Sequence, residues 1–166
     1  MTRTSYSDAY LWKMSAEGTT LWVVRSTGTG KEALGRVVVD GAVGVVAAGV
    51  SQSSATFGGV ALTSAGGFDA VIWKLSGEGT TLWAVRGGGT DDDHLDGVAV
   101  DGTGGLVAAG RFSSSPATFG GVSLSTAGSE DAMVWKVSGV FGSITYQTMF
   151  CSTLPPTHSF TIAKNV

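Results

Sequence analysis

The densest group of side chains that could do chemistry is the acidic run Asp91-Asp92-Asp93-His94-Leu95-Asp96-Gly97. Carboxylate oxygens suit Ca²⁺, which takes about six to eight oxygen ligands. The candidate ligands here are Asp91, Asp93 and Asp96. Their order does not match an EF-hand loop, and no glutamate stands at the closing position. A solvated loop without metal or cofactor is therefore the favoured interpretation.

Two further motifs could carry catalysis or phosphate binding. The histidines of the chain are His94, within the acidic run, and His158, near the C-terminal end. A Ser-His-Asp triad would need one of them held beside a serine and a carboxylate by the fold. The segment Gly28-Thr29-Gly30-Lys31 is similar to part of a phosphate-binding loop, but Glu32 stands where that loop needs serine or threonine. We predict no catalytic residues and a glycine-rich turn at this segment.

Composition excludes several classes of protein. The formal net charge is −3 without a cluster of basic residues, which gives no electrostatic footprint for nucleic acid. The longest apolar stretch, residues 43–50, is far shorter than the ~20 residues of a membrane helix. Residues 1–10 contain no apolar core of a signal peptide. Cys151 is the single cysteine, so no disulfide can form within the chain.

The elements that position these groups are repeated. Asp8–Ser15, Asp69–Ser76 and Asp131–Ser138 each begin with Asp-Ala and contain Trp-Lys at the fifth and sixth positions. Such self-similarity indicates stacked copies of one supersecondary unit. With 26 glycines in 166 residues, 43% hydrophobic and 14% charged residues, the chain is typical of short strands joined by tight turns.

One copy predicts four strands, A to D. Strand A ends at Asp40-Gly41, where positive φ angles favour a hairpin into strand B. A serine-rich connection, residues 51–55, then leads through Thr56-Phe57-Gly58-Gly59 to strand C. The expected strands are A (37–39), B (45–49), C (70–75) and D (81–86), and the next copy repeats A, B and C from residue 98 to 138.

Four consecutive antiparallel strands are the layout of a β-propeller blade, so we predict an all-β fold of such blades. Strand C should be buried on both faces, with Trp12, Trp73 and Trp135 in equivalent positions between blades rather than in a sugar-binding platform. The lysines that follow them, Lys13, Lys74 and Lys136, are expected to extend to the sheet edge.

The expected domain organisation is about two and a half blades within residues 1–143: a partial blade 8–25, a full blade 34–86 and a partial blade 95–138. Residues 144–166 form a divergent tail, so the last strand D is either absent or improvised from residues 144–149. Propellers close with roughly four to eight blades, which predicts an open arrangement and a fragment of a larger repeat protein. A gene product that departs from the repeat and a protomer that assembles with its own copies are the alternatives.

A known family shares these patterns. Gly97-Val98-Ala99-Val100-Asp101, Gly104–Gly110 and Asp131–Val137 resemble the β-propeller repeats of the SBBP type, and the resemblance covers roughly residues 8–139. The resemblance implies a large secreted or cell-surface protein. The family is defined by its scaffold, and it implies no catalytic residues.

The function expected from the sequence is a non-catalytic scaffold for binding a protein or a surface ligand. Binding would use loops at the ends of the propeller, among them Asp91–Asp96, Ser113–Pro116 and the Asp-Gly turns. The open blade edges should also favour self-association. The alternatives are a Ca²⁺-stabilised structural module and part of a propeller hydrolase or lyase.

Overall fold

The computed structural model describes residues 7–41, 44–138 and 145–151, which form antiparallel sheets. The prediction of an all-β chain is confirmed. The described part contains no helix that is long and apolar enough to cross a membrane. Its strands are β1 (Tyr10–Met14), β2 (Thr20–Gly28), β3 (Glu32–Val39), β4 (Val45–Phe57), β5 (Val60–Leu75), β6 (Thr81–Gly87), β7 (Asp93–Val100), β8 (Leu106–Phe112), β9 (Ala117–Phe119), β10 (Val122–Leu124), β11 (Asp131–Ser138) and β12 (Thr145–Cys151).

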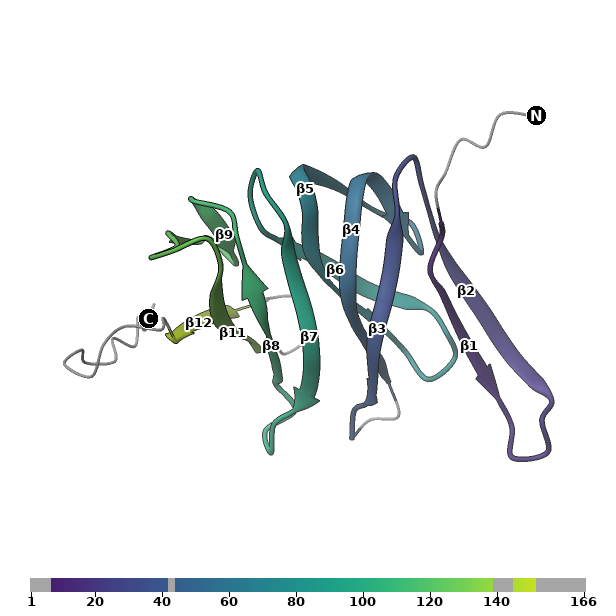
Figure 1. Ribbon diagram of the computed structural model, residues 1–166. Coiled ribbons are helices and arrows are strands. Elements are labelled where there is room, and N and C mark those ends of the chain that lie inside the picture. Colours follow the sequence, from purple (N-terminus) through teal and green to yellow (C-terminus); the bar gives the residue numbers. More distant parts are fainter. Residues whose placement is uncertain (1–6, 42–43, 139–144, 152–166) are drawn as a thin grey trace.

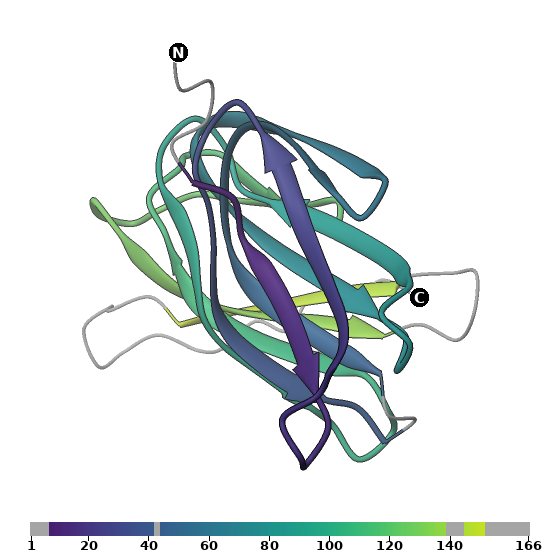
Figure 2. The ribbon, with the colours of Figure 1, turned by 90° about the vertical axis from the view of Figure 1, so that its right-hand side faces the viewer.

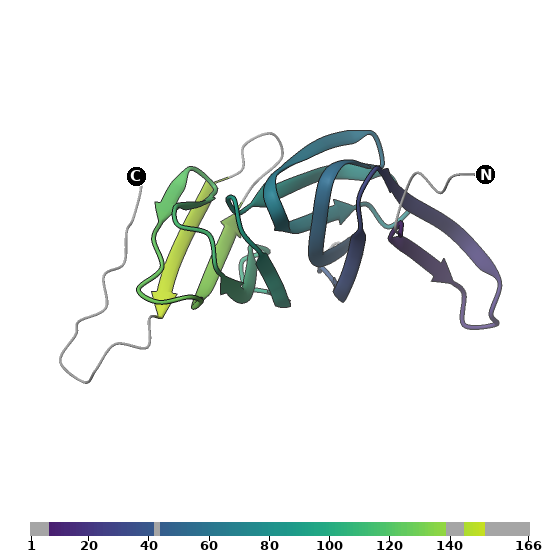
Figure 3. The same ribbon diagram turned by 45° about the horizontal axis from the view of Figure 1, so that its top comes forward.

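The strands form three layers that follow one another along the molecule (Figure 1). Figure 2 looks along this direction, with the N-terminal strands in front of the others. By hydrogen bonding, β1 to β6 form one six-stranded sheet, β7, β8, β11 and β12 form a four-stranded sheet, and β9 pairs with β10. We call the β1–β2 hairpin the first layer, β3 to β6 the middle layer and the four-stranded sheet the last layer. Figure 3 shows the layers fanned out in the order of the sequence. Both four-stranded layers have their strands in sequence order, and none of the sheets is closed.

Each layer is tied to the next where one repeat passes into another. β4 pairs with β3 and β5 along the middle layer, and its last residues, Ala55–Phe57, also pair with Ser26–Gly28 of β2. Gly88, after β6, forms the corresponding bridge to Thr118 of β9. The same backbone contact thus recurs at both junctions between repeats.

Two hydrophobic clusters fill the spaces between the layers. The cluster between the first and middle layers contains Trp73 and Phe57, whose rings meet edge to face at 5.4 Å. The cluster between the middle and last layers contains Trp135 and Phe119, whose ring centroids lie 5.5 Å apart. Because both clusters take side chains from β5, Ala70 to Trp73 are fully buried and the middle strand C is covered on both faces.

The predicted equivalence of the three strand-C tryptophans is wrong for Trp12. Trp12 lies on an antiparallel strand, and its indole N–H donates to Thr20 as that of Trp73 donates to Thr81. However, Trp12 is 62% exposed, whereas Trp73 and Trp135 are completely buried. The local strand is therefore repeated, but the layer that would cover Trp12 is missing from the described residues.

The serine-rich connection is partly a strand. In the middle layer β4 continues through residues 51–55, with a register shift between Gln52 and Ser54, and pairs with the start of β5. In the last layer the same region is interrupted between β8 and β9, at Pro116. Proline has no N–H for a strand ladder, which accounts for the interruption.

The Asp-Gly turns are stabilised by hydrogen bonds to the aspartate side chain. The expected positive φ angles are not found at Asp40-Gly41 or Asp101-Gly102. The Asp40 carboxylate accepts the N–H of Gly44 at 2.7 Å, and Asp101 accepts that of Gly105 at 2.8 Å. In the second turn the positive φ, 81°, belongs to Gly104. These carboxylates also explain the repeated lysine, because Lys74 pairs with Asp40 and Lys136 with Asp101, both at 3.0 Å.

The last layer has a fourth strand although the repeat stops before it. Residues 145–151 form β12, which pairs with β11 from Ala132 to Ser138. Of the two outcomes expected from the sequence, the improvised strand is the one that forms. An edge of β11 left free by the lost repeat is thus covered by a strand of unrelated sequence.

Candidate functional site

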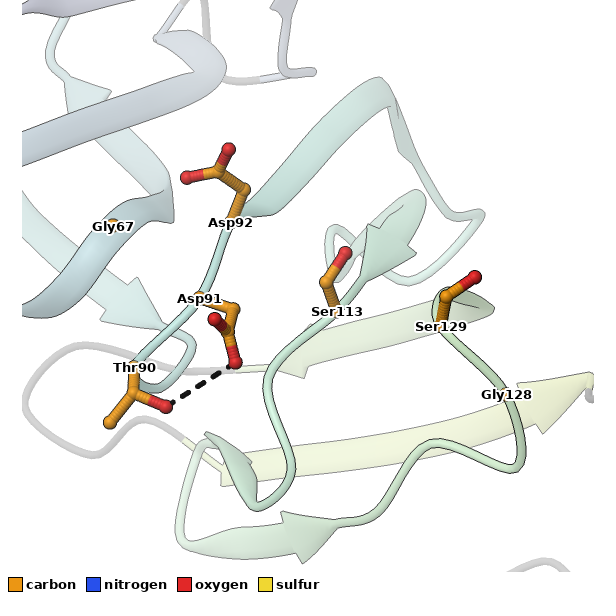
Figure 4. A pocket seen from close by; sticks show the side chains of 7 residues that line it. All are labelled: Gly67, Thr90, Asp91, Asp92, Ser113, Gly128 and Ser129. Atoms are coloured by element: carbon orange, nitrogen blue, oxygen red, sulfur yellow. Dashed lines mark hydrogen bonds between the residues drawn. The ribbon is translucent and has the colours of Figure 1, made fainter.

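The best candidate site is a polar pocket at the end of the middle and last layers (Figure 4). It has a volume of about 560 Å³. Four segments meet there: the β6–β7 connection, the residue directly after β8, the part of β5 at Gly67 and the β10–β11 loop. The lining residues are Gly67, Thr90, Asp91, Asp92, Ser113, Gly128 and Ser129.

Asp93 follows the pocket residues Asp91 and Asp92 and holds the β6–β7 connection in place. Its carboxylate is fully buried and accepts four hydrogen bonds. The donors are the N–H of Gly89 at 2.8 Å, the N–H groups of Ser113 and Ser114 at 3.1 and 3.3 Å, and the Ser114 hydroxyl at 2.6 Å. The Ser114 oxygen in turn accepts the N–H of Asp91 at 2.9 Å. This network positions the backbone of residues 89–93 against the end of β8.

The two carboxylates in the pocket have different roles. Asp92 accepts the N–H of Phe68 at 2.9 Å, which links the β6–β7 connection to the middle layer. Asp91 receives a long hydrogen bond, 3.4 Å, from the Thr90 hydroxyl. In Figure 4 the Asp91 side chain lies near Thr90, and the Asp92 carboxylate points away from it. Asp91 therefore retains acceptor capacity for a ligand.

The three candidate metal ligands have different surroundings and do not converge on one point. Asp93 is enclosed by its four donors, and Asp96 lies on the surface in an ion pair with Arg111 at 3.0 Å. Asp91 lines the pocket. In the part of the chain that the structure describes, no three His, Cys, Asp or Glu side chains are grouped so that they could hold a metal ion.

The other motifs are also accounted for by the fold. Residues 29–31 form the turn between β2 and β3, so the segment similar to a phosphate-binding loop leads into a strand, as expected for a turn. His94 lies on β7 with its ring 5.9 Å from that of Phe68. His158 lies outside the described residues.

The aspartate that opens each repeated motif has a local role that the sequence analysis missed. Asp69 accepts the N–H of Ala65 at 2.7 Å, and Asp131 accepts that of Ala127 at 2.6 Å. These bonds shape the segments before strand C, which hold the pocket residues Gly67, within β5, and Gly128, in the β10–β11 loop. Burial raises the pKa of Asp69 against the lowering effect of the Ala65 N–H and of Arg86, whose guanidinium is 3.0 Å away. The signal was available, because this aspartate recurs in all three copies.

Glu32 occupies, one repeat earlier, the position of Asp93. Both residues begin strand A, and both are buried. The Glu32 carboxylate receives no hydrogen bond from the described residues, in contrast to the four bonds that Asp93 receives. Burial, assisted by the nearby charge of Asp8, raises the pKa of Glu32 to about 7. The same position of the repeat thus holds a carboxylate with four donors at Asp93 and a carboxylate with a raised pKa at Glu32.

Comparison with known proteins adds no family to this picture. No family model matches the chain, and no curated protein matches it.

Proposed function

We propose that the chain is a non-catalytic scaffold of β-propeller-type repeats that binds a partner protein through its inter-layer loops. The observation that supports this most is the polar pocket, which brings together the corresponding positions Gly67 and Gly128 of two adjacent repeats and the connection between those repeats. Layers of four antiparallel strands in sequence order are consistent with propeller blades. The SBBP-type repeat family remains our assignment for them, and an extracellular or cell-surface location goes with that assignment.

The lining of the pocket favours binding over catalysis. It consists of glycine, serine, threonine and aspartate residues, and none of the lining residues is a histidine or lysine that could activate a serine. A volume of about 560 Å³ is ample for one large side chain. Since Asp91 brings a carboxylate and the lining brings no cation, the complementary ligand is a lysine or arginine side chain of the partner.

The proposal is tested by titrating short lysine- and arginine-containing peptides and their glutamine analogues into the protein by calorimetry. We expect the basic peptides to bind and the glutamine analogues to bind at least tenfold more weakly. Asp91→Asn should weaken binding of the basic peptides, and added salt should weaken it further. Asp96→Asn is the matched control, because Asp96 pairs with Arg111 outside the pocket lining. Equal binding of both peptide sets, or no effect of Asp91→Asn, would refute the proposal.

A further inference from the structure

The junction between the first and middle layers encloses two carboxylates without compensating contacts. Glu32, at the start of β3, is 1% exposed, and neither of its carboxylate oxygens has a hydrogen-bond partner among the described residues. Gly28 of β2 packs on it so closely that a Cβ there would lie 2.7 Å from a Glu32 oxygen. One oxygen of Asp8, which precedes β1, is also buried and unpartnered. Two such groups that feel each other's charge are unfavourable when both are ionised.

No cation in the described part of the chain pairs with Glu32. Lys31, beside it in β3, has its ammonium over an aromatic ring of β5, and the exposed Arg25 of β2 forms no ion pair. On β4 the residue opposite Glu32 is Ser51, whose buried hydroxyl makes no hydrogen bond. Asp69 of β5, opposite Ser51, adds a further carboxylate and is paired with a guanidinium of its own. The charged form of Glu32 is therefore left unsupported on every side.

The equivalent junction one repeat later shows what is missing. Asp93, the counterpart of Glu32, accepts four hydrogen bonds from residues 89, 113 and 114. The corresponding residues 28, 52 and 53 are all described, but none of them donates to Glu32. β4 continues as a strand through this stretch, and the Gln52 N–H donates to the Lys31 carbonyl oxygen at 3.0 Å. The lack of donors at Glu32 therefore follows from the local path of β4.

The segment Ser7–Asp8 is attached to β3 by few bonds. The Glu32 N–H donates to the Ser7 carbonyl oxygen at 2.9 Å, and Ser7 forms an isolated bridge with Lys31. By contrast, β3 is held to β4 by a ladder along its whole length. The first layer has a separate attachment, the pairing of Ser26–Gly28 with the end of β4. Repulsion at Glu32 thus acts on a short contact that can open while both sheets stay intact.

We propose that Asp8 and Glu32 form a pH-sensitive switch at the junction of the first and middle layers. With Glu32 protonated, Ser7–Asp8 stays on β3, which is the closed state. When Glu32 loses its proton to solvent, a second negative charge stands beside Asp8, and Ser7–Asp8 detaches so that both carboxylates reach water.

The direction of the switch follows from the two protonation states. Burial and the Asp8 charge raise the pKa of Glu32 to about 7 in the closed state, above its ordinary value of 4.5. The closed state is therefore favoured below about pH 4.5 and is lost as the pH rises through about 7. The switch shares no residue with the lining of the Asp91 pocket, so its failure would leave the proposed function untouched.

Amide hydrogen exchange of the full chain, resolved by residue with NMR at pH 5 and pH 8, tests the proposal. After correction for the intrinsic exchange rate, the Glu32 N–H should lose at least about tenfold of its protection at pH 8. The Gly88 N–H, which donates to Thr118 at the second junction, is the internal control and should lose much less. Unchanged protection at Glu32, or an equal loss at Glu32 and Gly88, would overturn the proposal, because the second result means that the whole fold weakens.

Three variants separate the switch from a general effect of pH. Glu32→Gln keeps the N–H that donates to Ser7 but cannot ionise, so protection at residue 32 should be the same at pH 5 and pH 8. Asp8→Asn should move the loss of protection to higher pH, because it removes the like charge but leaves an ionised Glu32 that is easier to tolerate. Glu17→Gln, at an exposed position of the β1–β2 turn, should behave as the parent chain. A loss of protection that persists in Glu32→Gln would refute the switch.

Discussion

At the scale of single residues, the repeat uses one position for two kinds of carboxylate. Asp93 is short enough to receive four hydrogen bonds from the end of β8 and from Gly89. Glu32, one methylene longer, is buried at the equivalent place beside Asp8 without such donors. A buried carboxylate without donors favours its protonated form, because desolvation penalises the charge.

This difference predicts how stability varies with pH. The folded-state pKa of Glu32, about 7, exceeds its ordinary value of 4.5, so the folded chain holds this proton more tightly than the unfolded chain. The contribution of Glu32 to the free energy of unfolding is complete below about pH 4.5 and is lost as the pH rises to about 7. The loss amounts to about 3 kcal/mol. Urea unfolding of the parent chain and Glu32→Gln between pH 5 and 8 measures it.

Glu32→Gln should be the more stable protein at pH 8 and should lose this part of the pH dependence. Glu17→Gln serves as a control, because Glu17 is exposed in the β1–β2 turn and the Ser15 hydroxyl lowers its pKa. An unchanged slope in Glu32→Gln would show that Glu32 is not the titrating group.

The acidic run gives a second prediction at this scale. Ca²⁺ at millimolar concentration should not raise the melting temperature, because Asp93 is already saturated by N–H and O–H donors and Asp96 is paired with Arg111. Calorimetry with Ca²⁺ and with a chelator measures this. A stoichiometric site tighter than about 10⁻⁵ M would contradict it and promote Asp91, Asp93 and Asp96 to ligands.

At the scale of elements, the repeated sequence of strand C is buried in one layer and exposed in another. Trp73 is packed between the layers against Phe57, whereas Trp12 projects from the first layer. Aromatic side chains stabilise a fold through the surface that they bury. Trp73 should therefore contribute more to the free energy of unfolding than Trp12, although the two stand at the same position of the motif.

Trp73→Ala should destabilise the protein by about 3–5 kcal/mol, the usual cost of removing a large buried aromatic side chain. Trp12→Ala is the matched control at the equivalent position, and it should cost about 1 kcal/mol or less because the side chain is already exposed. The denaturant midpoints of both variants check the prediction. Similar losses for the two variants would mean that Trp12 is covered in solution.

At the scale of the whole molecule, the described layers end in an uncovered apolar surface. Tyr10, Trp12, Met14, Val37 and Val39 are all more than one-third exposed, and they lie on or beside the free edge of β1. Such edges and patches promote association between chains.

We therefore expect concentration-dependent association of the isolated chain, measured by light scattering. Val39→Lys should reduce it by placing a charge in the groove beside β1. Leu82→Lys is the control, because Leu82 is an exposed apolar residue on β6 and does not line that groove. A stable monomer at millimolar concentration, or equal effects of the two lysines, would contradict the prediction.

The sequence alone determined the repeat, the strand order within it and the all-β class. These follow from local signals: the recurring Asp-Ala-x-x-Trp-Lys motif, the β-branched runs and the glycine-rich turns. It also located the acidic loop and Ser113, which the fold brings together in one pocket.

The tertiary structure alone decided which copies of each residue are buried and what each carboxylate contacts. The exposure of Trp12, the enclosure of Asp93, the pairing of Lys74 with Asp40 and the formation of β12 all depend on neighbours distant in sequence. Repetition specifies local backbone structure, but burial and charge pairing depend on whether an adjacent layer is present, and a single copy of the motif carries no information about that.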